Sequence, residues 1–189
     1  LLIKNMIDYK NYTLMYGNIE FDSNLSDWLK IEGNQFKIVL KNLSLCPFSG
    51  LAVRKSLMDW NALSLDLPAW QDDDFCIIAS KNGLIRYIDI TVAKNTLSED
   101  SISKSKSKQL IGLLILIDKY KDLILKNFGL WGLLMWRLRQ VCLFMEIISH
   151  DFITIKDSNI LYYIFGKFLG KLSKLLKYFM RFYFDRIFV

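Results

Sequence analysis

Residues 95–108 read NTLSEDSISKSKSK, and this serine- and lysine-rich stretch divides the chain into two parts of different character. The stretch is too polar to bury enough apolar surface to offset the entropy it would lose on ordering. We therefore predict a linker at 95–108, an acidic β-hairpin-rich unit at 1–94 and a basic helical unit at 109–189. Together these units predict an α+β fold.

Charge also separates near this stretch. Residues 1–103 hold 10 Lys and Arg against 13 Asp and Glu, a net charge of −3, whereas residues 104–189 hold 15 against 6, a net charge of +9. The overall charge of +6 therefore combines two oppositely charged halves. This asymmetry predicts that the second half faces an anionic partner.

Three dipeptides before the linker are typical of tight antiparallel turns. Glycine and asparagine tolerate the positive φ angles that two-residue hairpins require. Each dipeptide separates two β-compatible runs, so we predict three hairpins in an antiparallel sheet. The dipeptides are Gly17-Asn18, Gly33-Asn34 and Asn82-Gly83, and the runs are 12–16 with 19–21, 28–32 with 35–40, and 75–80 with 84–92.

One helix is predicted between the second and third hairpins, where Pro47 and Pro68 bracket the segment. Ser49 is a suitable N-cap for it. The residues expected on its inner face are Leu51, Val53, Leu57 and Met58.

Helical periodicity dominates after the linker and predicts helices at about 109–126, 129–149 and 157–186, with Asp157-Ser158 as the cap of the last. The apolar runs in the first two helices are interrupted by Asp118 and by Arg137 and Arg139. A membrane span needs about 20 predominantly apolar residues, so we expect none here.

The last predicted helix carries cations at steps of three and four residues among leucines and aromatic side chains. The cations are Lys167, Lys171, Lys174, Lys177 and Arg181. This spacing places them along one side of a helix. Three interpretations remain open: a solvated face, a face that contacts RNA phosphates, or a helix that lies on anionic lipid. Gly166 and Gly170 form a GxxxG in which we expect a local packing notch.

The residues that catalysis or metal binding needs are scarce. His150 is the one histidine, and the three cysteines are widely spaced. Asp72, Asp73 and Asp74 are adjacent, and we expect them in a solvated loop because neighbouring residues of an extended chain point in alternating directions. No nucleotide-binding or nucleophile motif is present. We predict a protein that is not an enzyme and that uses no catalytic residue, metal, cofactor or small-molecule substrate.

The composition is rich in residues with A/T-rich codons, such as Leu, Ile, Lys, Phe and Asn, and contains only 2 Pro and 1 His. AT-rich genomes produce this bias, among them many organelle genomes and those of AT-rich bacteria and parasites. We take the organelle case, which predicts a mitochondrial location, in the matrix or associated with the inner membrane. The mean hydropathy of +0.22 and the pI near 9.1 indicate a basic chain that buries apolar surface against partners.

Two hypotheses follow from the sequence. The first is a structural subunit of a mitochondrial ribosome, with rRNA and neighbouring protein subunits as partners. The second is an accessory subunit of an inner-membrane respiratory complex, with a basic helix at the membrane surface. For the first, the predicted phosphate contacts are Lys104, Lys106, Lys108, Lys167, Lys171, Lys174, Lys177, Arg181 and Arg186, with Arg137 and Arg139 as weaker candidates.

Overall fold

The computed structural model of the 189-residue chain describes residues 2–21, 24–25, 30–42, 47–95, 105–154 and 160–187. The chain divides into two compact units, Leu1–Ser101 and Ile102–Val189, and the boundary between them falls inside the serine- and lysine-rich stretch. The first unit contains a sheet with short helices, and the second is helical. The predicted α+β class is confirmed.

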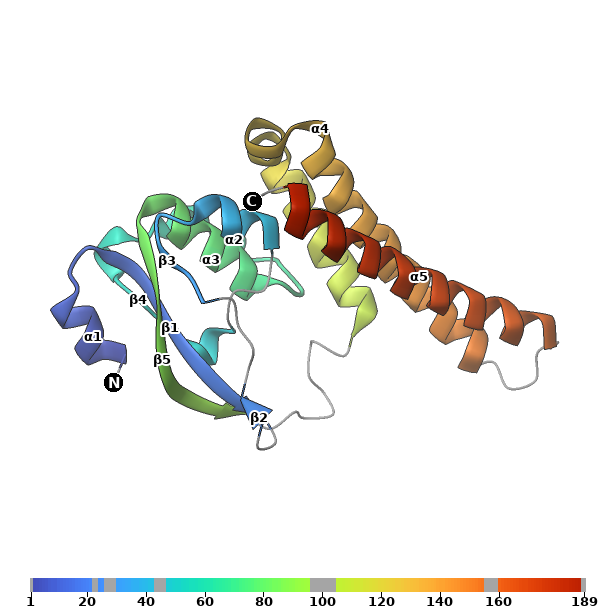
Figure 1. Cartoon of the computed structure of the whole chain (residues 1–189), viewed down its shortest axis with the longest axis horizontal. Coiled ribbons are helices and arrows are strands. Elements are labelled where there is room, and N and C mark those ends of the chain that lie inside the picture. Colours follow the sequence, from blue (N-terminus) through green and yellow to red (C-terminus); the bar gives the residue numbers. More distant parts are fainter. Residues whose placement is uncertain are drawn as a thin grey trace. The chain divides into compact units, whose positions relative to one another are not determined.

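Two long parallel strands form the centre of the first unit (Figure 1). Strand β1 (Tyr12–Phe21) pairs with β5 (Leu84–Asn95) from Tyr12 opposite Leu84 to Phe21 opposite Asn95. Three short strands complete the mixed sheet in antiparallel contacts: β2 (Asn24–Leu25) and β4 (Leu51–Val53) on β1, and β3 (Glu32–Gly33) on β5. The sequence predicted an antiparallel sheet, and this prediction is wrong for the central pair, because β1 and β5 are parallel.

The remaining elements of this unit are short. They are α1 (Leu2–Asp8), α2 (Phe36–Asn42), α3 (Gln71–Asn82) and the 3-10 turns Phe48–Gly50, Lys55–Leu57 and Trp60–Ala62. Helices α2 and α3 lie in the connection between β1 and β5. A parallel pair needs such a long crossover, since a tight turn can join only antiparallel strands.

None of the three predicted hairpins forms. Gly17 lies in the middle of β1, where an added Cβ would be 2.7 Å from the Ile90 oxygen, so the glycine permits close approach of β5. Gly33 has a positive φ of 91°, but it leads from β3 into α2. Asn82-Gly83 joins α3 to β5 instead of two strands. The glycines therefore serve close packing or helix–strand connections.

The run 75–80, predicted as a strand, is the body of helix α3. All six of its side chains are buried, so no exposed face interrupts the apolar run. Periodicity cannot distinguish a helix from a strand when every position is apolar or buried. The signal for a helix was the acidic triplet that precedes the run, because carboxylates in the first turn interact favourably with the helix dipole.

The helix predicted between Pro47 and Pro68 is also wrong. The segment forms 3-10 turns and the strand β4, whose Val53 lies opposite Leu14 and whose Leu51 lies opposite Tyr16 of β1. The Arg54 amide extends this pairing by donating to the Thr13 carbonyl at 2.8 Å. Pairing with the edge of β1 therefore replaces local helical hydrogen bonds in this segment.

The core of the first unit is built on β1, where Leu14, Met15, Tyr16 and Ile19 are fully buried. The buried Tyr16 hydroxyl accepts a hydrogen bond from the Ile31 amide at 3.1 Å. This bond satisfies a polar group inside the core and holds the chain next to β3 against the sheet.

The second unit contains α4 (Lys106–Thr154) and α5 (Ile160–Ile187). Gly129 interrupts α4 with a φ of 63°, which divides it into helical segments 106–128 and 130–154. Lys106, at the start of the first segment, forms an ion pair with Glu146 of the second, so the segments fold back on each other. The three predicted helices agree with these segments, except that 106–108, assigned to the linker, are helical. The predicted cap Asp157-Ser158 lies outside the described residues.

Apolar side chains at helical spacing form the interior of the second unit. In the first segment of α4 these are Leu113, Leu116, Ile117, Tyr120 and Ile124, and in the second they include Met135, Trp136, Cys142 and Leu143. Among the residues that the structure describes, no helix combines the length and apolar character that a membrane crossing requires.

We expect Gly83→Ala to destabilise the first unit, because the added Cβ would lie 1.8 Å from the Thr13 Oγ1 atom on β1. Overpacking of this kind costs about 1–3 kcal/mol of unfolding free energy. Urea denaturation of Gly83→Ala, of Thr13→Ala and of the double variant measures the effect. Removing the Thr13 hydroxyl should recover part of the lost unfolding free energy. If Gly83→Ala costs the same with and without Thr13→Ala, this contact is not the cause.

Candidate phosphate-binding surface of the helical unit

Small residues bring α5 close to the second segment of α4. The Ser149 hydroxyl donates to the Gly166 carbonyl at 2.7 Å, and a Cβ at Gly170 would lie 2.9 Å from the Ser149 Oγ atom. One helical turn further, the buried Ser173 hydroxyl lies 3.2 Å from the Cys142 carbonyl. The packing notch expected at the GxxxG is confirmed, and it fixes which side of α5 faces inward.

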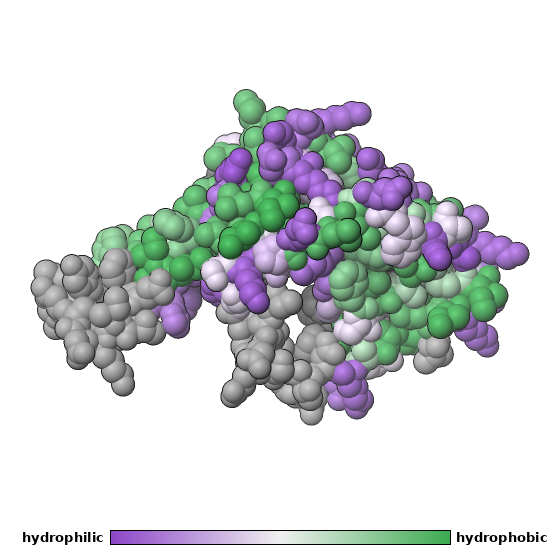
Figure 2. Space-filling view, turned by 180° about the vertical axis from the view of Figure 1, so that it is seen from behind, coloured by the Kyte–Doolittle hydropathy of each residue, from purple (hydrophilic) through white to green (hydrophobic). Residues whose placement is uncertain are grey.

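The remaining surface of α5 carries two sets of exposed side chains. Lys167, Lys171 and Lys174, here called the lysine stripe, project from one side of the helix. The apolar stripe lies next to them at helical spacing and consists of Ile164, Phe168, Leu175 and Phe179, each 41–64% exposed. Figure 2 shows that apolar side chains reach the surface of the molecule between hydrophilic ones on the face drawn.

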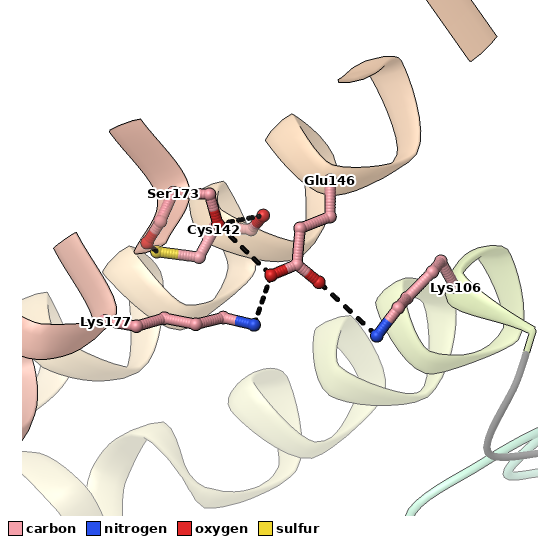
Figure 3. A network of polar contacts seen from close by, with 5 residues as sticks. All are labelled: Lys106, Cys142, Glu146, Ser173 and Lys177. Carbon is pink, nitrogen blue, oxygen red and sulfur yellow. Dashed lines mark hydrogen bonds and ion pairs between the residues drawn. The ribbon is translucent and has the colours of Figure 1, made fainter. Parts of the chain in front are cut away.

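Glu146 on α4 connects three helical segments through its carboxylate (Figure 3). Its Oε2 atom lies 3.3 Å from the Lys106 Nζ atom, and its Oε1 atom pairs with the Lys177 ammonium and lies 3.2 Å from the Ser173 Oγ atom. Two cations that we predicted to contact phosphate therefore neutralise a carboxylate of their own unit.

The cations around Glu146 decide its protonation. Burial on its own raises the pKa of the carboxyl group, but the hydrogen bond and charge of Lys177, together with Lys106, outweigh burial and hold the pKa below its ordinary value. Burial raises the pKa of the neighbouring Cys142 thiol. The thiol therefore stays protonated at neutral pH and packs as a small apolar group.

The predicted phosphate contacts fall into several groups. Lys167, Lys171 and Lys174 lie together on α5, whereas Lys106 and Lys177 lie at Glu146. Lys108 is exposed in the first turn of α4. Arg137 is exposed and bonds to the Gln140 side chain at 3.0 Å, and Arg139 is half-buried. Lys104 lies outside the described residues, as do the side chains of Arg181 and Arg186.

Sequence reasoning missed Glu146, Ser149 and Ser173. The available signal was their spacing: 142, 146 and 149 on α4, and 166, 170 and 173 on α5, all follow steps of three or four residues. Such steps place small or polar residues on one helix face, where they can form an interface.

The aspartate triplet has a structural role. Asp73 and Asp74 are buried at the start of α3, and the Asp74 Oδ2 atom accepts a hydrogen bond from the Ser64 amide at 2.9 Å. Burial also raises the pKa of Asp72. The expectation of a solvated loop was wrong, because the triplet forms the first helical turn. In the described part of the chain, no group of three or more His, Cys, Asp or Glu side chains is arranged to hold a metal ion.

No protein-family model, curated protein or solved structure matches this chain.

We expect Glu146→Gln to lower the stability of the helical unit at pH 7 by about 1 kcal/mol, since partial exposure lets solvent screen the pair. Because the folded pKa of Glu146 is lowered, its contribution is present above the unfolded value near 4.5 and is lost as pH falls through the folded pKa. The difference in unfolding free energy between wild type and variant should therefore shrink as the pH is lowered from 7 to about 3.

Denaturation followed by circular dichroism at several pH values measures this difference. Asp118→Asn is the matched control, since Asp118 forms an exposed pair with Lys121 at 3.2 Å and should contribute only a few tenths of a kcal/mol. A loss in Glu146→Gln that does not change with pH would contradict the ion-pair explanation.

Proposed function

We propose that the chain is a non-catalytic structural subunit of a large organellar assembly, a mitochondrial ribosome, and that its helical unit contacts rRNA. The observation that supports this proposal most directly is the lysine stripe of Lys167, Lys171 and Lys174. All three side chains are exposed, while the opposite side of α5 is held against α4 by Gly166 and Ser173.

The spacing of the stripe suits a phosphate backbone. With a rise of about 1.5 Å per residue, the three lysines lie within about 10 Å along the helix axis. Ammonium groups at this pitch can neutralise neighbouring phosphates and release their condensed counterions. Such contacts position a protein on RNA without reading bases, which is the role of a structural subunit.

The packing of α5 presents the stripe on a firm support. The Ser149 and Ser173 hydroxyls tie α5 to α4, and the Glu146–Lys177 pair adds a charged contact one turn beyond Ser173. A cationic surface on a fixed helix loses less conformational entropy on binding than one on a mobile segment. The first unit, in the acidic half of the chain, would face protein subunits in this proposal.

We expect Lys171→Glu combined with Lys174→Glu to weaken association with rRNA and to flatten its salt dependence. Removal of each phosphate-binding lysine should reduce the slope of log K against log salt by about 0.7–0.9. Filter binding to rRNA at several salt concentrations measures both effects. Lys37→Glu combined with Lys55→Glu makes the same charge change at exposed positions of the first unit, and equal weakening by both pairs would contradict a specific role for α5.

A second candidate function is supported by the apolar stripe. Ile164, Phe168 and Leu175 are 57–64% exposed beside the lysines. A helix with large apolar side chains flanked by lysines can lie on anionic lipid, with its ammonium groups extended to the headgroups. This arrangement favours an accessory subunit of an inner-membrane respiratory complex as the alternative.

Fractionation of mitochondria distinguishes the two functions. After alkaline carbonate or high-salt extraction without detergent, a ribosomal subunit should leave the membrane pellet, and in gradients at physiological salt it should sediment with ribosomal particles. Retention in the membrane pellet under both treatments would contradict the ribosomal function. Release of the triple variant Ile164→Ser, Phe168→Ser and Leu175→Ser from that pellet would then support the respiratory-complex alternative.

A further inference from the structure

A second exposed face lies on the second segment of α4 and is not part of the surface described above. Leu130, Leu134, Val141 and Phe144 are 80%, 43%, 42% and 53% exposed, and Arg137 is exposed among them. We call these five residues the outer seam. Large apolar side chains gathered on one helix face are typical of a protein-binding surface.

The spacing of the outer seam is that of a coiled-coil interface. Its members follow one another at steps of four, three, four and three residues, which is the alternation of d and a positions in a heptad repeat. The same helix uses steps of three, four and seven residues on its buried side, where Met135, Leu138, Cys142 and Ser149 face inward. This segment of α4 therefore has two faces with apolar side chains, and α5 packs against the inner one.

Arg137 specifies what the outer seam can accept. Its Nη1 atom bonds to the neutral Gln140 side chain at 3.0 Å, and in the described part of the chain no carboxylate forms an ion pair with it. A single polar residue at a core position of a coiled coil selects a complementary partner. A guanidinium in this position favours a carboxylate on the facing helix, with which it can form two parallel hydrogen bonds.

We propose that the outer seam binds an α-helix of another protein that carries apolar residues at heptad spacing and an Asp or Glu opposite Arg137. A second copy of this chain is a poor occupant. Arg137 is the middle residue of the seam, so a two-fold pairing centred on the seam, parallel or antiparallel, brings two guanidinium groups together. A lipid surface is also a poor occupant, because the cation stands in the centre of the apolar face instead of at its edge.

This proposal is independent of the ribosomal function, since it concerns a protein partner and a different helix face. An assembly subunit that contacts RNA through α5 could use α4 for a neighbouring protein, but the outer seam would bind a helix equally well in a respiratory complex. Loss of rRNA binding would therefore leave the proposal intact.

The probe is a labelled helical peptide of about three heptads, with leucine at its a and d positions and one central glutamate. A second peptide carries lysine in place of that glutamate. Fluorescence anisotropy with the full chain should show saturable binding of the glutamate peptide and at least about tenfold weaker binding of the lysine peptide. Arg137→Glu should reverse this preference.

Phe144→Ser should weaken binding of the glutamate peptide by about tenfold or more. Ile111→Ser, which removes a side chain of similar exposure (51%) from the first segment of α4, should leave binding unchanged. If Phe144→Ser does not fold, the charge reversal at Arg137 still tests the proposal, because it exchanges one exposed side chain for another.

Three results would overturn the proposal. The first is the absence of saturable binding by the glutamate peptide, or equal binding of both peptides. The second is sedimentation showing self-association that Phe144→Ser abolishes, which assigns the seam to a second copy. The third is flotation with anionic vesicles that Phe144→Ser abolishes, which assigns the seam to lipid.

Discussion

The close contact of α5 with the second segment of α4 is the constraint on which the surface chemistry of the helical unit depends. Gly166 and Ser173 leave so little volume between the helices that hydroxyl groups bond across to main-chain carbonyls. A helix face lined by small residues can pack this way only in one rotational setting. That setting turns the lysine stripe and the apolar stripe outward together. The exposure of both stripes is therefore a consequence of the positions of the small residues on α5.

A comparable constraint acts in the first unit, where β1 and β5 are parallel. Their pairing removes Gly17 from any turn and requires the chain between them to cross over through α2, the 3-10 turns and α3. The same pairing leaves no space for a side chain at Gly83, next to Thr13. In both units, therefore, glycines stand where an atom of a neighbouring element leaves no room for a side chain.

How far the sequence predicts this structure depends on whether each signal is local. Helical periodicity from residue 109 onward was sufficient to place all three helical segments, because each has one buried face and one exposed face. The boundary between the two compact units, at residues 101 and 102, lies close to the charge change near residue 103. The hairpin predictions were wrong because a Gly-Asn pair has the same local conformational freedom whether it forms a turn or accommodates a neighbouring strand. Strand pairing between residues about 70 positions apart leaves no local trace that separates these cases.

The candidate site shows the same division between local and non-local signals. The spacing of Lys167, Lys171 and Lys174 was enough to place them on one side of a helix, and they do lie there. The pairing of Lys106 and Lys177 was not predictable, because it depends on Glu146, which lies 40 and 31 positions away, and on the reversal at Gly129. The structure therefore separates cations that neutralise a carboxylate between the helices from cations that stand on the exposed side of α5. Net charge alone cannot make that distinction, so the +9 of the second half overstates the charge that this unit offers to an anionic ligand.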